Sequence, residues 1–159
     1  MAFSLENIVF LPYKITNMLK TIHSYWAYLV LIILVLAVIN SILAIAKKRE
    51  FTDKDLRIGL FTLITNHIQL LLGLIVYFSG PYFKMLTGNT SEVMKNSELR
   101  KLALEHPLTM IIAIVLITIG WSRHKKKEGK AKFATFVIFY GLALVLILSM
   151  IPWNVWPSF

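Results

Sequence analysis

The sequence predicts an all-α integral membrane protein folded as an up-down bundle of four transmembrane helices. Of its 159 residues, 57% are hydrophobic, and four long segments contain no charged side chain: residues 25–46, 58–83, 107–122 and 133–159. A helix needs about 20 mainly apolar residues to cross a bilayer, where the backbone must satisfy its own hydrogen bonds. These segments occupy most of the chain and leave no room for a soluble catalytic domain.

The first predicted helix covers residues 25–46. It follows an N-terminal segment, residues 1–24, that we expect to lie on the outer membrane surface as an amphipathic helix. This segment does not resemble a cleaved signal peptide, because the long apolar run begins only at Tyr25 and no small-residue cleavage pattern follows it. We therefore divide the chain into this segment and a four-helix transmembrane domain of residues 25–159.

Three further helices are predicted over residues 58–79, 103–122 and 133–153. Gly80 and Pro81 provide a stop signal after the second helix. The third charge-free segment is short, but the helix-favouring "RKLALE" before it extends the same helix. Because the first and third connections are short, they predict two antiparallel helical hairpins.

The net charge of +9 comes mainly from the two short loops. They contain 11 of the 17 basic residues: Lys47, Lys48, Arg49, Lys54, Arg57, Arg123, Lys125, Lys126, Lys127, Lys130 and Lys132. Basic residues in short loops face the cytoplasm, which predicts that both termini and the longer second loop lie on the outer side of the membrane. The same loops attract anionic membrane lipids, and this ordinary role argues against nucleic acid as a partner.

The composition also excludes several kinds of chemistry. The chain has no cysteine, which removes disulfides, iron–sulfur clusters and covalent haem attachment. No predicted helix carries Asp, Glu, Lys or Arg near its middle, so a pump or channel built on intramembrane carboxylates is disfavoured. Histidines are the remaining candidates for a functional site, and we expect no substrate-converting catalytic residue.

His23 and His106 are the first-ranked pair of candidate ligands. Each begins a helix that runs inward from the outer face, so the two rings are expected at similar depth. In an up-down bundle the first and third helices are diagonal neighbours, and two imidazoles that face each other can bind haem iron at both axial positions. Pro107 is tolerated near a helix start and angles His106 inward.

The residues that follow both histidines at helical spacing form stripes rich in small side chains, which could admit a macrocycle. They are Ala27, Val30, Leu34, Ala37, Ser41 and Ala44 in the first helix, and Thr109, Ala113 and Gly120 in the third. Small residues also line ordinary interfaces between membrane helices. The two stripes therefore permit a cofactor without requiring one.

His67 lies near mid-membrane in the second helix, beside a polar and small stripe made of Gly59, Thr62, Asn66, Gln69 and Gly73. It is the alternative ligand; a proton relay, a quinone contact and a structurally satisfied histidine are the other interpretations. Thr62, Asn66 and Gln69 are expected to form hydrogen bonds across helices. His124 follows the third helix among lysines, and we expect a solvated loop residue there.

The chain resembles a family of small bacterial four-helix membrane proteins labelled as b-type cytochromes, the cytochrome B family. The similar segments are "IHSYWAYLVLI", "FTDKDLRIGLFTLITNHIQ", "NHIQLLLGLIVYFSGP", "EHPLTMIIAIVLITIG" and "IFYGLALVLILSMIPW", within residues 23–153. The resemblance implies a protein of the bacterial inner membrane, with its outer side in the periplasm. It also implies that His23, His67 and His106 match the family's histidine positions, whereas His124 falls in a variable loop. The chain departs from the family at Tyr25-Trp26, where an arginine often precedes the tryptophan, and at "LEHPL", where "TVEH" is usual. A role for that arginine, such as pairing with a haem propionate, does not carry over.

These observations predict a b-type cytochrome-like protein that carries electrons through a non-covalent, bis-histidine haem b. Its propionates are expected near Lys20 or Arg100, and a quinone or a larger respiratory or other membrane complex is expected to exchange the electrons. The alternative is a cofactor-free accessory subunit that packs against such a complex through its small-residue stripes and its outer amphipathic segment. A metal-handling or haem-delivery protein needs the same histidines and is a third class.

Overall fold

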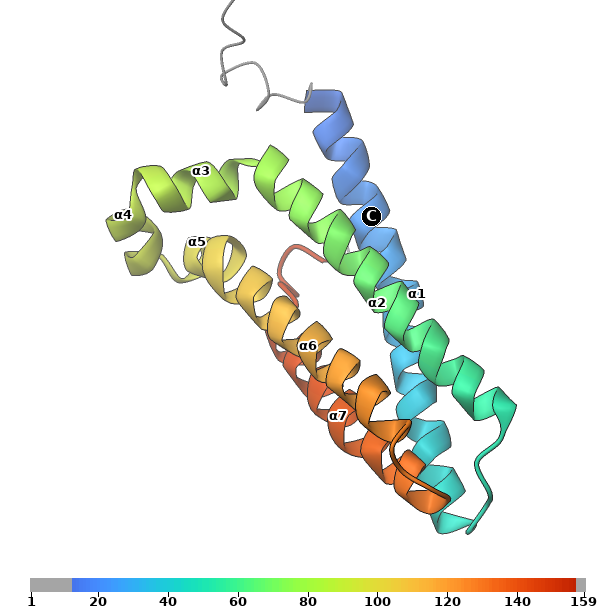
Figure 1. Ribbon diagram of the computed structural model, residues 1–159. Helices are drawn as coiled ribbons and strands as arrows, with labels where there is room; N and C mark the ends of the chain where they lie inside the picture. Colours follow the sequence, from blue (N-terminus) through green and yellow to red (C-terminus); the bar gives the residue numbers. More distant parts are fainter. Residues whose placement is uncertain (1–12, 157–159) are drawn as a thin grey trace, which may run out of the picture.

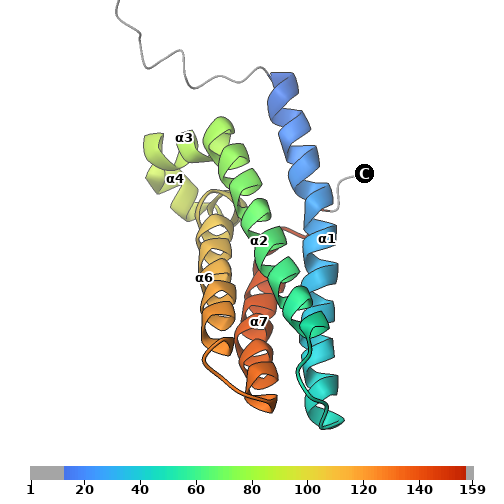
Figure 2. The same ribbon diagram turned by 45° about the vertical axis from the view of Figure 1, so that its right-hand side comes forward.

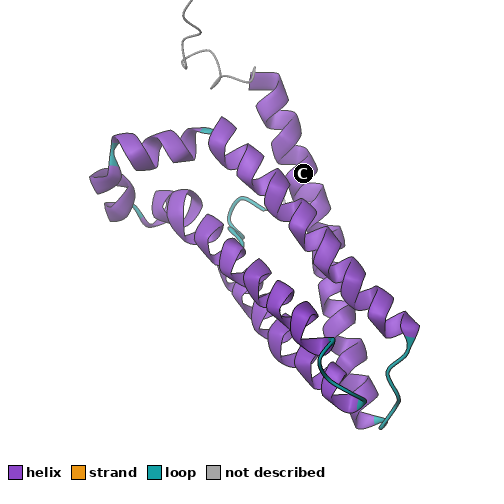
Figure 3. Ribbon diagram, in the orientation of Figure 1, coloured by secondary structure: helices purple, strands orange, loops and turns teal. Residues whose placement is uncertain are grey.

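The computed structural model describes residues 13–156, which form helices, turns and short loops with no strand in that range (Figure 3). The four long helices are α1 (Tyr13–Ala46), α2 (Asp53–Ser79), α6 (His106–His124) and α7 (Lys130–Met150). Between α2 and α6 lie α3 (Pro81–Gly88), α4 (Thr90–Lys95), α5 (Ser97–Arg100) and a π-helical turn, Lys101–Glu105. Each long helix is long and apolar enough to cross a membrane, α6 together with the turns that precede it.

The long helices form a ring. In this ring α1 packs against α2 and α7, while α6 packs against α7 and α2 (Figures 1 and 2). Helices α1 and α6 therefore occupy opposite corners of the bundle. The structure confirms the predicted all-helical architecture with four candidate membrane helices, whereas the direction of the bundle in a membrane stays a prediction.

Several helix boundaries differ from those predicted. Helix α1 is continuous from Tyr13 to Ala46, so its first turns do not form a separate amphipathic helix; residues 1–12 lie outside the described residues. Helix α2 begins at Asp53, five residues early, because Asp55 Oδ2 accepts a hydrogen bond from the Thr52 amide at 2.9 Å and caps the first turn. Helix α6 runs on through His124.

One buried carboxylate organises the end of the bundle that carries the two short loops, residues 47–52 and 125–129, here called the basic end. Asp55 is 3% exposed and accepts hydrogen bonds from both terminal nitrogens of Arg49, each at 2.7 Å, and from Asn40 Nδ2 at 2.8 Å. Thr52 Oγ1 donates to the same carboxylate at 2.7 Å. The pairing with Asp55 raises the pKa of the Arg49 guanidinium. The network fastens the end of α1 to the start of α2.

The core toward the basic end is closely packed because glycines let the helices approach. A Cβ atom at Gly59 would lie 2.7 Å from Phe136 Cζ, and one at Gly120 would lie 2.7 Å from Phe139 Cβ. Tyr140 is fully buried, and its hydroxyl donates a hydrogen bond to the Gly59 carbonyl at 3.1 Å. This contact joins α7 to α2 across the bundle and closes it at this level.

The opposite end, here called the wide end, is more open. Helices α2 and α6 diverge toward it, and α3, α4 and α5 cross from one to the other (Figure 1). Residues 151–156 turn back from α7 between the helices, where Trp156 Nε1 donates a hydrogen bond to the Ser24 carbonyl at 3.3 Å. These segments surround the cavity described below.

Large apolar side chains cover the outside of the bundle. Ile32, Leu36, Leu71 and Val145 each expose more than half of their surface. Soluble monomers rarely expose wide, contiguous apolar surface. Together with the length of the helices, this surface suggests a multi-pass membrane protein.

Candidate functional site

A cavity of about 360 Å³ lies at the wide end of the bundle. Its volume falls within the roughly 300–1,000 Å³ typical of small-molecule and cofactor sites, which are mostly apolar with a few placed polar groups. Its polar or ionisable lining residues are Lys20, His23, Ser24, Asn66, Gln69, Tyr77, Tyr82, His106 and Trp156. The remaining wall is aliphatic apart from prolines and Gly73, and all four long helices contribute to it.

His23 and His106 both line this cavity, as their predicted depth and diagonal placement suggested. His23 belongs to α1 and His106 begins α6, and these helices occupy opposite corners of the bundle. The structure therefore brings together the pair that was ranked first from the sequence.

The ring of His106 has a defined orientation. Its Nδ1 lies 3.0 Å from the Met150 carbonyl oxygen at the end of α7. Because a carbonyl can only accept, Nδ1 carries the proton and donates this hydrogen bond, which leaves Nε2 as the nitrogen with a free lone pair. Metal-bound histidines are commonly held in this way.

The backbone around His106 departs from a regular α-helix. The His106 amide donates to the Lys101 carbonyl, five residues earlier, within the π-helical turn. Pro107 has no N–H and cannot donate the α-helical hydrogen bond to Ala103, which is 1% exposed. Tyr77 of α2 donates to that carbonyl instead, at 2.8 Å. Single π-turns are frequent at functional sites, and here the turn determines how α6 presents His106.

The ring of His23 packs directly on the backbone of α2. A Cβ atom at Gly73 would lie 3.1 Å from His23 Cε1 and 3.6 Å from Nδ1, so glycine leaves the space that the imidazole fills. The Gln69 side chain donates from Nε2 to the His23 carbonyl at 3.1 Å. His23 Nδ1 is buried and has no hydrogen-bond partner among the described residues.

The polar stripe of α2 contributes to the cavity only in part. Asn66, Gln69 and Gly73 line it, whereas Gly59 and Thr62 are buried nearer the basic end. The predicted hydrogen bonds across helices are right for Gln69 alone. Thr62 Oγ1 donates to Ile58 O at 2.9 Å and Asn66 Nδ2 donates to Thr62 O at 2.8 Å, both within α2.

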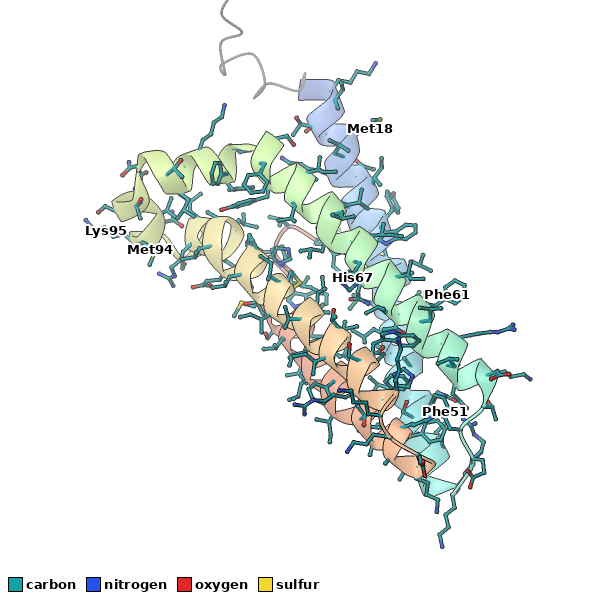
Figure 4. All side chains as sticks on the ribbon, viewed as in Figure 1. Met18, Phe51, Phe61, His67, Met94 and Lys95 are labelled. Carbon is teal, nitrogen blue, oxygen red and sulfur yellow. The ribbon has the colours of Figure 1, made fainter. Side chains whose placement is uncertain are left out.

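His67 lies outside the cavity, on the side of α2 that faces α6 (Figure 4). Its Nδ1 lies 2.8 Å from the Leu63 carbonyl and its Nε2 lies 3.4 Å from Thr118 Oγ1 of α6. Both ring nitrogens of His67 therefore contact residues, Leu63 and Thr118, that do not line the cavity. The structure does not bring this alternative ligand together with His23 and His106.

His124 is buried, and the expectation of a solvated loop residue is wrong. It is 1% exposed, and its Nδ1 donates to the Trp121 carbonyl. Its ring lies between those of Trp121 and Phe136, with centroid distances of 4.6 and 4.8 Å. The signal was present in the sequence: Ala113, Ile117, Gly120 and His124 recur at helical spacing, and all are buried. The lysines that follow His124 made its position resemble a solvated loop, although it continues the helical spacing of the buried residues.

The two cations expected near haem propionates differ in placement. Lys20 lines the cavity. Arg100 does not; its Nε donates to Glu105 at 2.7 Å and its terminal nitrogen donates to the Met94 carbonyl at 2.8 Å. Glu105 is thus paired with Arg100 of the segment between α2 and α6. Lys20 remains the cation available to an anionic group in the cavity.

The residues that line the cavity include groups that could hold a haem. Zinc takes three or four protein ligands, and nowhere between residues 13 and 156 do three His, Asp or Glu side chains gather to hold a metal ion. A haem iron needs only two axial protein ligands, because the macrocycle supplies the others. Two histidines, one buried Nδ1 without a partner, Lys20 and an apolar wall match those needs.

Comparisons of the chain with protein-family models, with curated proteins and with solved structures found no match in any of the three. The resemblance to the cytochrome B family therefore stays a prediction, and the site is interpreted below from its own geometry.

Proposed function

We propose that the chain is a membrane electron carrier of the b-type cytochrome kind, with haem b bound non-covalently between His23 and His106. One observation carries this proposal: two histidines from opposite helices line one mostly apolar cavity of about 360 Å³. When bound, the haem supplies reversible one-electron transfer at its iron. The chain's own residues bind the group, orient its ligands and exclude water.

His106 has the features of a pre-oriented residue that would hold the haem iron. Its hydrogen bond to the Met150 carbonyl fixes the Nδ1–H tautomer and raises the basicity of Nε2. The Tyr77–Ala103 hydrogen bond restrains the turn from which the ring projects. A fixed ligand reorganises little when the iron changes charge, which suits electron transfer rather than substrate conversion.

The lining of the cavity accounts for the other requirements of the cofactor. Leu31, Met110, Ile147 and Ile151 are among the apolar residues that would exclude water from the macrocycle. Such a lining disfavours added charge and thereby influences the potential. Lys20 is placed to pair with a propionate.

We infer further that the bundle lies in a bacterial inner membrane with its basic end in the cytoplasm. The basic residues of the two short loops support this orientation. The cavity would then lie in the outer half of the membrane. A quinone or a neighbouring redox subunit at that depth is the expected electron partner.

The cofactor-free accessory subunit remains the competing proposal. Its predicted docking surface, the small-residue stripes, packs inside the chain's own bundle, since Ala37, Ser41 and Ala44 of α1 are at most 2% exposed. A partner would have to bind the exposed apolar surface or the outer amphipathic segment instead. This observation favours the cytochrome proposal.

The proposal is tested on the full chain, expressed in haem-replete cells and purified in mild detergent. A dithionite-reduced minus oxidised visible spectrum is expected to show a sharp α-band, with about one haem per chain in a pyridine haemochrome assay. A colourless preparation would reject the electron carrier and leave the accessory subunit, which is then identified by what co-purifies with it.

A further inference from the structure

Two buried polar atoms without partners lie in adjoining parts of the proposed site. They are His23 Nδ1 and the side-chain oxygen of Gln69. Buried polar groups in proteins are nearly always paired, so each exception calls for a physical account. Both residues line the cavity, and they come from neighbouring helices, α1 and α2.

The amide of Gln69 is anchored by His23 itself. Gln69 Nε2 donates to the His23 carbonyl at 3.1 Å. A carbonyl accepts only, so the nitrogen end of the amide must face it, and the oxygen end must face away. This assignment leaves Gln69 Oε1 as a buried acceptor that needs a donor.

His23 offers such a donor one helical turn away. Its ring lies against Gly73, with Nδ1 at 3.6 Å from the position a Cβ would take there. Gln69 and Gly73 are four residues apart and so share one face of α2. A protonated Nδ1 needs an acceptor at that face, and Oε1 is the unpaired acceptor that the face provides.

We propose that Gln69 is the positioning residue for His23: its Oε1 accepts a hydrogen bond from His23 Nδ1–H and leaves Nε2 free for iron. The bond reproduces on α1 the arrangement that His106 has with the Met150 carbonyl. It requires rotation of the two side chains, with the amide still anchored at the His23 carbonyl. The effect on iron rests on the proposed haem site, whereas the hydrogen bond itself does not.

The hydrogen bond has a signature in protein without haem. Chains labelled with ¹⁵N-histidine are compared by NMR, with His23→Ala to assign the His23 ring. We expect the Nδ1–H tautomer at His23 in the wild type and its loss in Gln69→Leu. An Nε2–H tautomer in the wild type, or an unchanged ring in Gln69→Leu, would overturn the proposal. Gln69→Glu keeps an acceptor oxygen and is expected to retain the Nδ1–H tautomer at His23. This variant is measured in place of Gln69→Leu if the leucine variant does not fold.

The effect on iron is read from haem-loaded protein. An acceptor on Nδ1 makes the ligand more basic and favours ferric iron. Gln69→Leu is therefore expected to shift the midpoint potential upward and weaken haem retention by about 10- to 100-fold, and Gln69→Glu to shift the potential downward. Thr62→Val is the control, because Thr62 is buried on the same helix outside the cavity and its hydroxyl bonds only within α2. Equal shifts in Gln69→Leu and Thr62→Val would contradict the positioning role.

The two measurements separate the two proposals. Haem absent from the wild type, together with the expected NMR result, rejects the electron carrier but retains the Gln69–His23 hydrogen bond. Haem present with an Nε2–H tautomer at His23 rejects the positioning residue alone.

Discussion

The hydroxyl of Tyr77 on α2 donates a 2.8 Å hydrogen bond to the carbonyl of Ala103. In a regular α-helix this carbonyl would accept from residue 107, but Pro107 has no N–H. The bond replaces a missing backbone interaction and connects α2 to the turn that precedes His106. A buried carbonyl without a donor is costly, so this pair stabilises both the wide end of the bundle and the position of the histidine.

Tyr77→Phe is expected to lower the stability of the protein by about 1–3 kcal/mol, because it leaves the Ala103 carbonyl buried and unpaired. Thermal unfolding in detergent, followed by circular dichroism, measures the change. Tyr82→Phe is the control, since Tyr82 lines the same cavity but its hydroxyl forms no hydrogen bond with another described residue. Equal effects of the two substitutions would count against this role of Tyr77.

Gly73→Val is expected to displace the His23 ring, because even a Cβ at this position would lie 3.1 Å from Cε1. Overpacking of this kind costs about 1–3 kcal/mol, and we expect haem loss to become about tenfold faster as an axial ligand shifts. Transfer of haem to an excess of apomyoglobin measures the rate. Gly141→Val on α7 is the control, because a Cβ there meets nothing within 4 Å. An unchanged rate in Gly73→Val would show that His23 is not a ligand in this position.

Arg49→Ala is expected to lower the free energy of unfolding by about 1.5–3 kcal/mol, since it removes charge-assisted hydrogen bonds from the buried Asp55. The value is below that of a fully buried pair because the Arg49 side chain is 37% exposed.

Arg100→Ala is expected to lower the free energy of unfolding by only about 0–1 kcal/mol. It breaks an ion pair near the surface, in which the side chains of Arg100 and Glu105 are 34% and 35% exposed. Chemical unfolding of both variants in detergent checks the order, and a reversed order would contradict the assigned role of Asp55.

The orientation of the bundle is testable because the natural chain has no cysteine. Single substitutions Ser91→Cys in α4 and Lys127→Cys in the loop before α7 place one thiol at each end, both at exposed positions. We expect a membrane-impermeant maleimide to label position 91 in intact spheroplasts and position 127 only after the membrane is opened. The opposite pattern would invert the bundle and place the cavity toward the cytoplasm.

Much of the architecture followed from the sequence because membrane helices are dictated by length and apolarity. The sequence also predicted that His23 and His106 lie near each other, and both line one cavity on helices from opposite corners of the bundle; their role as a ligand pair stays a prediction. Helical spacing also identified the buried side of α1, where Val30, Leu34 and Ala37 are nearly inaccessible.

Other features depend on contacts between distant segments that local patterns do not record. Asp55 lies before the predicted second helix, residues 58–79. Its partners, Arg49 and Asn40, lie outside the helix that it caps, so no local pattern indicated its role. No sequence pattern indicated a role for Tyr77, because its partner, the Ala103 carbonyl, lies in a distant segment of the chain. Gly73 stood in the predicted stripe of α2, but its role became evident only when the His23 ring was seen to fill the space beside it.

The most direct measurement of the central claim is the haem content of four proteins purified in parallel: wild type, His23→Ala, His106→Ala and His67→Ala. His67 is the matched control because it lies in the bundle but outside the cavity. We expect about one haem per chain in the wild type and in His67→Ala, with loss of haem or of its low-spin spectrum in the other two variants. Full, spectrally unchanged haem in both His23→Ala and His106→Ala would contradict the proposed site.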